Sequence, residues 1–114
     1  MAIHRAGTYS VTIKPPEAPS AYSKILVSFA QNQQIVVEKK TGDSGFSTTA
    51  DSVEVTLTQA ETLLFQPTVG SPMGDERGQM AFVQIRCYKS ALDAPASKIW
   101  PIDVYDSLNR EVLS

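Results

Sequence analysis

The stretch VEVTLTQAETLLF, residues 53–65, constrains the fold of this chain most. In its first five residues, Val and Leu alternate with Glu and Thr, which predicts a strand with one buried face. Thr58 and Glu61 follow at the spacing of a capping box, in which the Thr side chain accepts from the Glu amide and the Glu side chain accepts from the Thr amide. We therefore expect a strand that runs directly into one helical turn. That turn is expected to return its last residues to the core: Leu63, Leu64 and Phe65.

Alternation of apolar and polar residues recurs along the chain, in short stretches separated by segments rich in Pro, Gly, Asn or Ser. The further predicted strands are 8–13, 24–31, 34–40, 79–88 and 98–104, with a weaker extended segment at 46–51. Asn32 and Gln33 are expected to form the tight turn of a hairpin. This spacing predicts an all-β protein, an antiparallel Ig-like β-sandwich of about six strands with one or two short helical turns. A small β-barrel is the alternative.

Two of these stretches carry information about neighbours in the sheet. Residues 79–88 place apolar side chains on both faces, so this strand is expected to be central or to face another chain. One face carries Ala81, Val83, Ile85 and Cys87, and the other Met80, Phe82, Gln84, Arg86 and Tyr88. In residues 98–104, Trp100 is expected to point inward, and Pro101 predicts a sheet edge because proline has no amide N–H.

Length and composition favour one globular domain, residues 1–114, with residues 1–6 as an N-terminal arm. The charged fraction is 19% and the net charge is -2, which gives no general attraction to nucleic acid or acidic membranes. No apolar run approaches the roughly 20 residues that span a bilayer, and no signal-peptide core is present, so we expect use without Sec export. A single cysteine excludes an internal disulfide.

Few residues carry the chemistry of a catalytic or metal site. His4 is the only histidine, and with no orienting partner nearby it is expected at the surface. Cys87 falls on an apolar strand face and is expected to be a small buried hydrophobe. Asp43, Ser44 and Asp51 lack the spacing of a calcium loop and are expected to be turn residues. We therefore predict no catalytic residue, no metal site and no cofactor, and we expect that the chain is not an enzyme.

Aromatic side chains offer one further possibility. Tyr22, Tyr88, Trp100 and Tyr105 could form a platform for a sugar, although core or interface packing is the stronger expectation for the inward Trp100. The pair Lys39-Lys40 is too short to predict nucleic-acid binding. A carbohydrate-binding or host-adhesion module is therefore kept as the alternative function.

Three segments together resemble a group of small proteins carried by phages and prophages of Gram-positive, gut-type bacteria. They are SKILVSFAQNQQIVVEKKTGD, VEVTLTQAETLLF and VQIRCYKSALDAPASKIWPIDVYDSLNREVLS. The family pattern is a hairpin with ITFAQN and VILEK, then V…LTQEETL.F, then VQIRV and a C-terminal segment. The chain departs from it at residues 66–78, which are longer than usual, and at Trp100-Pro101. The middle segment is the most specific, and its matching positions are Leu57, Thr58, Gln59, Glu61, Thr62 and Phe65.

The resemblance implies a virion structural protein of a bacteriophage, associated with the capsid, connector or tail and acting by protein–protein assembly. The implied partners are other virion proteins and copies of the chain itself, with no sequence-specific nucleic acid and no membrane. The implied location is the virion, assembled in the host cytoplasm, and the alternative function becomes an adhesion module of a tail or baseplate. An exposed loop is predicted over residues 66–78. Candidate interface residues are those of the termini, of this long loop and of the outer face of strand 79–88: His4, Arg5, Met73, Asp75, Arg77, Met80, Phe82, Arg86, Tyr88 and Leu113. Thr58 and Glu61 are assigned to the cap alone.

Overall fold

A computed structural model describes residues 2–68, 78–89 and 96–105 of the chain. This part contains eight strands, one short α-helix and one 3₁₀ turn. The strands are β1 (Ala2–His4), β2 (Tyr9–Ile13), β3 (Lys24–Gln31), β4 (Gln34–Lys40), β5 (Phe46–Thr48), β6 (Val53–Leu57), β7 (Ala81–Tyr88) and β8 (Ala96–Tyr105). The helical elements are η1 (Pro19–Ala21) and α1 (Gln59–Thr62). No helix within the described ranges is long and apolar enough to cross a membrane.

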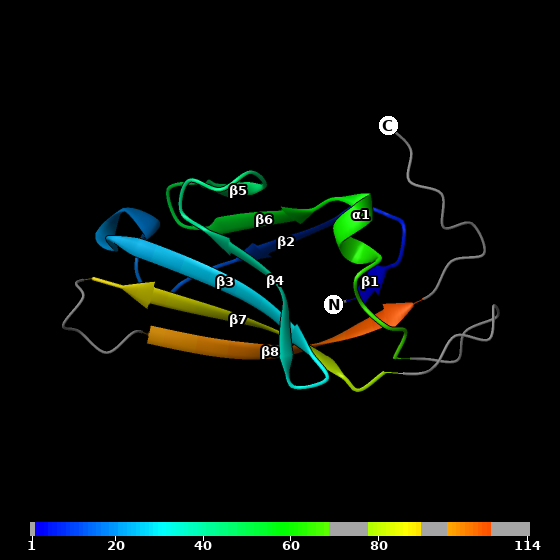
Figure 1. Cartoon of the computed structure of the whole chain (residues 1–114). Helices are drawn as coiled ribbons and strands as arrows, with labels where there is room; N and C mark the ends of the chain where they lie inside the picture. Colours follow the sequence, from blue (N-terminus) through cyan, green and yellow to red (C-terminus); the bar gives the residue numbers. More distant parts are fainter. Residues whose placement is uncertain (1, 69–77, 90–95, 106–114) are drawn as a thin grey trace.

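The strands form two sheets that lie one above the other (Figure 1). One sheet has the order β1-β8-β7-β3-β4, and the other has the order β2-β6-β5. This is the strand arrangement of an immunoglobulin sandwich, in which β2, β5 and β6 face a sheet built from β1, β3, β4, β7 and β8. The predicted all-β, Ig-like sandwich is confirmed, and two separate sheets replace the alternative of a closed barrel.

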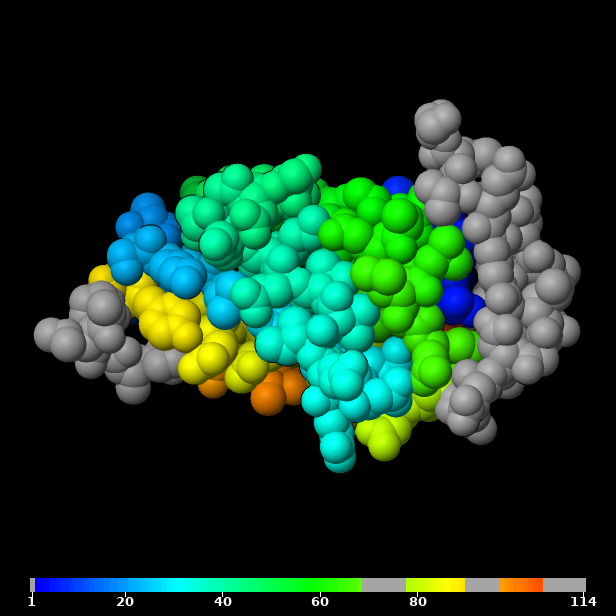
Figure 2. Space-filling view, in the orientation of Figure 1, coloured from blue at the N-terminus to red at the C-terminus, as the bar shows by residue number. Residues whose placement is uncertain are grey.

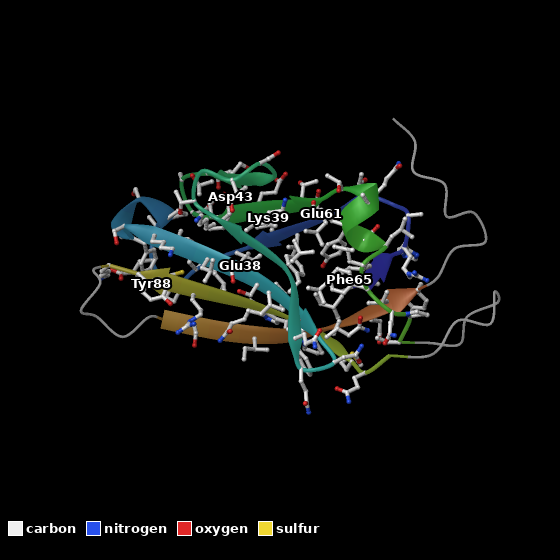
Figure 3. All side chains as sticks on the ribbon, in the orientation of Figure 1. Glu38, Lys39, Asp43, Glu61, Phe65 and Tyr88 are labelled. Atoms are coloured by element: carbon white, nitrogen blue, oxygen red, sulfur yellow. The ribbon has the colours of Figure 1, made fainter. Side chains whose placement is uncertain are left out.

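The inner faces of both sheets supply the core, as the alternation predicts. Val53, Val55 and Leu57 of β6 are fully buried, and Phe29 of β3 packs edge-to-face on Phe65 with ring centroids 6.3 Å apart. Figure 3 shows Phe65 between the two layers. The side chains pack because successive residues of a strand point to opposite faces, so each strand sends every second side chain inward.

Cys87 lies on the inner face of β7, and burial raises the pKa of its thiol. The prediction that it is a buried hydrophobe is confirmed. Antibody-type domains join the corresponding strand to the second strand of the chain by a disulfide. Here the second strand is YSVTI and contains no cysteine, so apolar packing takes the place of that bridge.

The corner between β6 and α1 forms as the sequence predicts. The Thr58 hydroxyl accepts a hydrogen bond from the Glu61 amide at 3.2 Å, and the Glu61 carboxylate accepts from the Thr58 amide at 2.9 Å. Phe65 returns to the core, but Leu64 is 61% exposed, so its predicted burial was wrong. Consecutive residues of a helical turn point about 100° apart, so three in a row do not share one buried direction.

The predicted N-terminal arm is part of the sandwich. Residues 2–4 form β1, which pairs in parallel with Asp103–Tyr105 of β8 and buries Ile3 completely. The only parallel pair among the described strands therefore departs from the predicted antiparallel sheet. Pro101 does not mark an edge strand either, since β8 lies between β1 and β7. It occupies the part of β8 that β1 does not reach, so its missing N–H costs β8 no hydrogen bond to β1.

Residue Gln31, at the end of β3, fixes both ends of the predicted long loop. Its side-chain amide donates to the carbonyl oxygens of Gln66 at 2.8 Å and Gln79 at 2.9 Å, and its carbonyl accepts from the Gln66 amide at 2.7 Å. The Gly78 amide donates to the Pro67 carbonyl at 2.8 Å. Pro67 and the next residue are buried, so the loop does not begin as an exposed segment. Because Gln31 is 3% exposed, these bonds are shielded from water.

Candidate functional site

The side of the five-stranded sheet that points away from the core, called the outer face below, is the main candidate site. Cross-strand register sets its side chains in rows. The first row joins Lys40, Leu26, Arg86 and Ser97. The second joins Glu38, Ser28, Gln84 and Ile99. The third joins Ile35, Ala30, Phe82 and Pro101. Neighbours in a row are close enough to act as one surface, since paired Cβ atoms lie about 5 Å apart.

One end of the outer face is apolar and open to solvent. Ile35 is 61% exposed, Ile99 57%, and Met80 and Phe82 43% each. Among Ile35, Phe82 and Ile99 the surface sinks into a hollow of about 410 Å³. Its lining is Leu26, Ser28, Ala30, Ile35, Glu38, Phe82, Gln84, Arg86 and Ile99. Single exposed apolar residues are ordinary, but a group of large ones around one hollow is typical of a binding surface.

The apolar end continues onto the tip of the β3–β4 hairpin. A second hollow of about 180 Å³ shares Ala30 and Phe82 with the first and is also lined by Asn32, Gln33 and Met80. Both turn residues have positive φ, 55° at Asn32 and 64° at Gln33, as a two-residue hairpin turn of this type requires. The predicted turn is confirmed. Figure 2 shows the hairpin (cyan) projecting from the rest of the surface, so a partner can reach it.

The opposite end of the outer face carries charge. The Glu38 carboxylate lies 3.5 Å from the Ser28 hydroxyl, which donates to it, and the Arg86 guanidinium lies 5.7 Å from the ring centroid of Tyr88. Lys40 borders Leu26 in the first row and is exposed. The charged residues therefore lie toward one end of the outer face, and two of them, Glu38 and Arg86, line the same hollow as the exposed apolar residues.

The predicted interface residues divide into three sets. Met80, Phe82, Arg86 and Tyr88 belong to β7 or the residues just before it and share the outer face. His4 and Arg5 lie at the far end of the sheet, beside Tyr105, the last residue of β8. The remaining predicted interface residues lie outside the described part of the chain: Met73, Asp75, Arg77 and Leu113. The sequence also predicts a final short helix capped by Asp106, and that segment likewise lies outside the described part.

The surroundings of His4 and Arg5 are structural. The His4 ring stacks on Tyr105 with centroids 5.3 Å apart and planes 18° apart, and its predicted exposure is confirmed. Arg5 donates its amide to the Tyr105 carbonyl and a guanidinium N–H to the Leu63 carbonyl at 3.4 Å. These contacts tie β1 to β8 and to the end of α1.

Ile35 and Ile99 are site residues that sequence reasoning missed. Ile35 stands in a run of three apolar residues, so alternation alone left its direction open. The β3–β4 register shifts between Phe29 and Ala30, which places Ile35 opposite Ala30 and Val37 opposite Phe29. The outward direction of Ile99 could have been predicted, because Trp100 was expected to point inward and successive residues of a strand point to opposite faces.

Lys39 points to the other side of the sheet and joins the two layers. Its ammonium lies 2.9 Å from the Glu61 carboxylate and donates to the Ser44 carbonyl at 3.1 Å (Figure 3). Burial disfavours ionisation of Glu61, but the Lys39 ammonium and the Thr58 amide outweigh it and hold the pKa of the carboxyl below its ordinary value. Glu61 thus serves the cap and the contact between sheets together.

The remaining candidates form no composite site. Tyr88 and Tyr105 lie at opposite ends of the β7–β8 pair, and Tyr22 packs against the core, so the predicted aromatic set makes no single platform. Asp43 accepts from the Lys40 amide, and Asp51 accepts from neighbouring hydroxyls, as turn residues do. Within residues 2–68, 78–89 and 96–105, no group of three or more His, Cys, Asp or Glu is placed to hold a metal ion.

Comparison with known proteins yields likeness of shape alone. No protein-family model and no curated protein matches the chain. Among solved structures, a strand-swapped dimer of the Ig-like domain of mouse leukocyte-associated immunoglobulin-like receptor 1 is 10% identical, with a TM-score of 0.47 over 91% of this chain and 85% of that one. The NK cell receptor NKp44 is 13% identical, with a TM-score of 0.49 over 91% and 94%. The fold assignment rests on strand order, to which these scores add no further argument.

Proposed function

We propose that this chain is a non-enzymatic structural protein of a bacteriophage virion, and that it assembles with other proteins through the outer face of the five-stranded sheet. The observation that carries the proposal is the group of exposed apolar side chains Ile35, Phe82 and Ile99 around one hollow, with Met80 at a second hollow that Phe82 also lines. The resemblance of the hairpin, the capped corner and the C-terminal segment to phage-borne proteins supplies the virion context.

The outer face supports assembly on energetic grounds. Full burial of one large apolar side chain is worth about 1.5–3 kcal/mol. The four side chains are roughly half exposed, so covering them would contribute about 3–6 kcal/mol before the cost of association. This amount suits one contact among many in a particle. In a symmetric assembly, weak contacts act together because each copy is held at several places.

The proposal is tested by Phe82→Asp. A tagged chain is produced in the bacterium that carries the phage, particles are purified, and the amount of chain per particle is measured. We expect the amount of the Phe82→Asp chain per particle to be at least tenfold lower than that of the original chain, because a carboxylate would have to be buried in the contact. Thr12→Asp on the exposed outer side of β2 is the matched control and should stay near the original amount.

Two results would overturn the proposal. One is a Phe82→Asp chain that stays on particles as the original does. The other is reproducible binding on a glycan array that is lost when Tyr22 or Tyr105 is replaced, which would point to the adhesion module. Each variant is first checked for an unchanged melting temperature, so that loss of the fold is separated from loss of binding.

A further inference from the structure

We infer that the occupant of the outer face is a second copy of this chain, in a two-fold dimer in which Glu38 pairs with Arg86 of the partner subunit. This inference rests on the proposed function, because it assigns a partner to the same face. A two-fold interface is self-complementary, so each residue and its counterpart exchange roles across the axis. The outer face meets that condition in its charges, its aromatic group and its area.

The charges complement each other when the face meets a copy of itself. Glu38 lies on β4 and Arg86 on β7, with β3 between them. Within the described part of the chain, Glu38 has a long bond to the Ser28 hydroxyl and Arg86 faces the Tyr88 ring, and no salt bridge joins either charge to another group. Each charge therefore keeps the capacity for a charge-assisted hydrogen bond to a partner.

Strand register gives the position of the axis. Glu38 and Arg86 are two strands apart and one row apart, which is about 10 Å across the sheet and about 7 Å along it. A two-fold axis that lies in the plane of the face and exchanges Glu38 with Arg86 passes midway between the two residues. It crosses β3 between Leu26 and Ser28. It then crosses β7 between Gln84 and Phe82. Two salt bridges related by symmetry thus flank a central line of uncharged side chains.

Phe82 is the residue that this axis brings against its own counterpart. Its ring is 43% exposed and borders both hollows, so two copies can each place a ring in the hollow beside the other. Aromatic pairs of this kind are worth about 0.5–1.5 kcal/mol beyond the area they bury. The apolar end and the charged end of the face are then used in one contact.

The area fits a reversible dimer. Four strands spaced about 4.8 Å apart and eight residues long at about 3.3 Å each give a face of roughly 500 Å² per copy. Two copies together cover roughly 1,000 Å², at the lower end of specific protein–protein interfaces. We therefore expect a dimer that dissociates on dilution and not an obligate one.

Charge reversal tests the inference. Sedimentation velocity over a dilution series measures the dimer dissociation constant of the whole chain, of Glu38→Arg, of Arg86→Glu and of the double variant. Each single variant places like charges opposite each other, and we expect a weakening of at least tenfold. The double variant restores opposite signs and should return to within about threefold of the original. Glu54→Arg on the exposed outer side of β6 is the matched control and should leave the constant unchanged.

Each outcome separates this inference from the proposed function. A chain that stays monomeric at its highest concentration, or a double variant no tighter than the single ones, overturns the dimer. If the dimer is overturned in either way but Phe82→Asp still abolishes binding to particles, the proposed function stands and another protein covers the face. If the dimer forms and responds to charge reversal while Phe82→Asp stays on particles, the dimer stands and the assembly role falls.

Discussion

The outer sides of the two sheets differ although their inner sides are alike. On the three-stranded sheet the outward residues are polar: Ser10, Thr12, Ser47, Glu54 and Thr56. Ser10 and Thr56 are joined by a hydrogen bond of 2.9 Å between their hydroxyls. On the five-stranded sheet the outward residues include Ile35, Phe82 and Ile99, each more than two-fifths exposed.

The difference separates the needs of folding from those of binding. An antiparallel sheet needs one apolar face for the core and is stable with a polar face toward water, as β2, β5 and β6 show. The apolar outer face of β3, β4, β7 and β8 is therefore not required by the sandwich. Folding does not require these exposed apolar side chains and contact with water disfavours them, which is why we propose this face as the assembly surface.

The largest effect is expected in the core. Phe29 is fully buried and contacts the rings of Tyr9 and Phe65, so Phe29→Ala should lower the free energy of unfolding by about 3–5 kcal/mol. Phe82→Ala should lower it by less than about 1 kcal/mol, because the side chain is already partly in water. Urea denaturation compares the two. A similar loss in both variants would show that the outer face contributes to the stability of the fold itself.

The polar sheet is expected to be sensitive at one glycine. A Cβ on Gly45 would lie 2.5 Å from the Thr56 carbonyl oxygen, whereas a Cβ on Gly42 would have no atom within 4 Å. Both have positive φ, 83° and 94°. Gly42→Ala should cost about 1 kcal/mol from φ alone. Gly45→Ala should cost about 2–3 kcal/mol, since it adds displacement of β6. Equal melting temperatures for the two variants would mean that β5 moves freely against β6.

The corner that leaves the polar sheet gives a smaller effect. Thr58→Ala removes the acceptor for the Glu61 amide and should cost about 1 kcal/mol. Thr12→Ala removes a hydroxyl of the same type from the polar outer side and should change stability by less than about 0.5 kcal/mol. Thermal unfolding of both variants measures the difference. No difference between them would show that the cap contributes nothing to the corner.

The smallest effect concerns the ion pair that joins the two sheets. The folded pKa of Glu61 lies below its unfolded value, so ionised Glu61 stabilises the fold above the unfolded value of 4.5, and the contribution is lost as pH falls through the folded value. Glu61→Gln should therefore lower the melting temperature near pH 7 and have little effect near pH 3. Glu54→Gln is the control. A deficit of Glu61→Gln that is the same at both pH values would contradict the role of the charge.

The fold could be predicted where the signal is local. Alternation in residues 53–57 and the three-residue spacing of Thr58 and Glu61 are complete within the stretch that they describe, and both were confirmed. β1 escaped prediction because three residues show no period, and its only reason to be a strand is β8, almost a hundred residues later in the chain. Pro101 was misassigned for the same reason, since sequence gives the lack of an N–H but not the extent of a distant neighbour.

The candidate site could be predicted in part. The two apolar sides of β7 identified Met80, Phe82, Arg86 and Tyr88, and the structure places all of them on or beside one surface. Ile35 depended on a register shift between two strands, which no pattern within β4 specifies. The apolar residues on both sides of β7 thus indicated an apolar outer face, and strand pairing determined which residues of the neighbouring strands belong to it.

The bonds of Gln31 make the sandwich independent of what lies between its two anchored points. The Gln31 side chain is bonded to both Gln66 and Gln79, and the Gly78 amide is bonded to the Pro67 carbonyl. These bonds hold the two ends of the intervening segment together. A doubling of such a segment costs only about 0.6 kcal/mol of closure entropy. The segment between Gln66 and Gln79 is thus one where the entropy cost of an insertion is small. A foreign peptide placed there should be displayed without changing the scaffold.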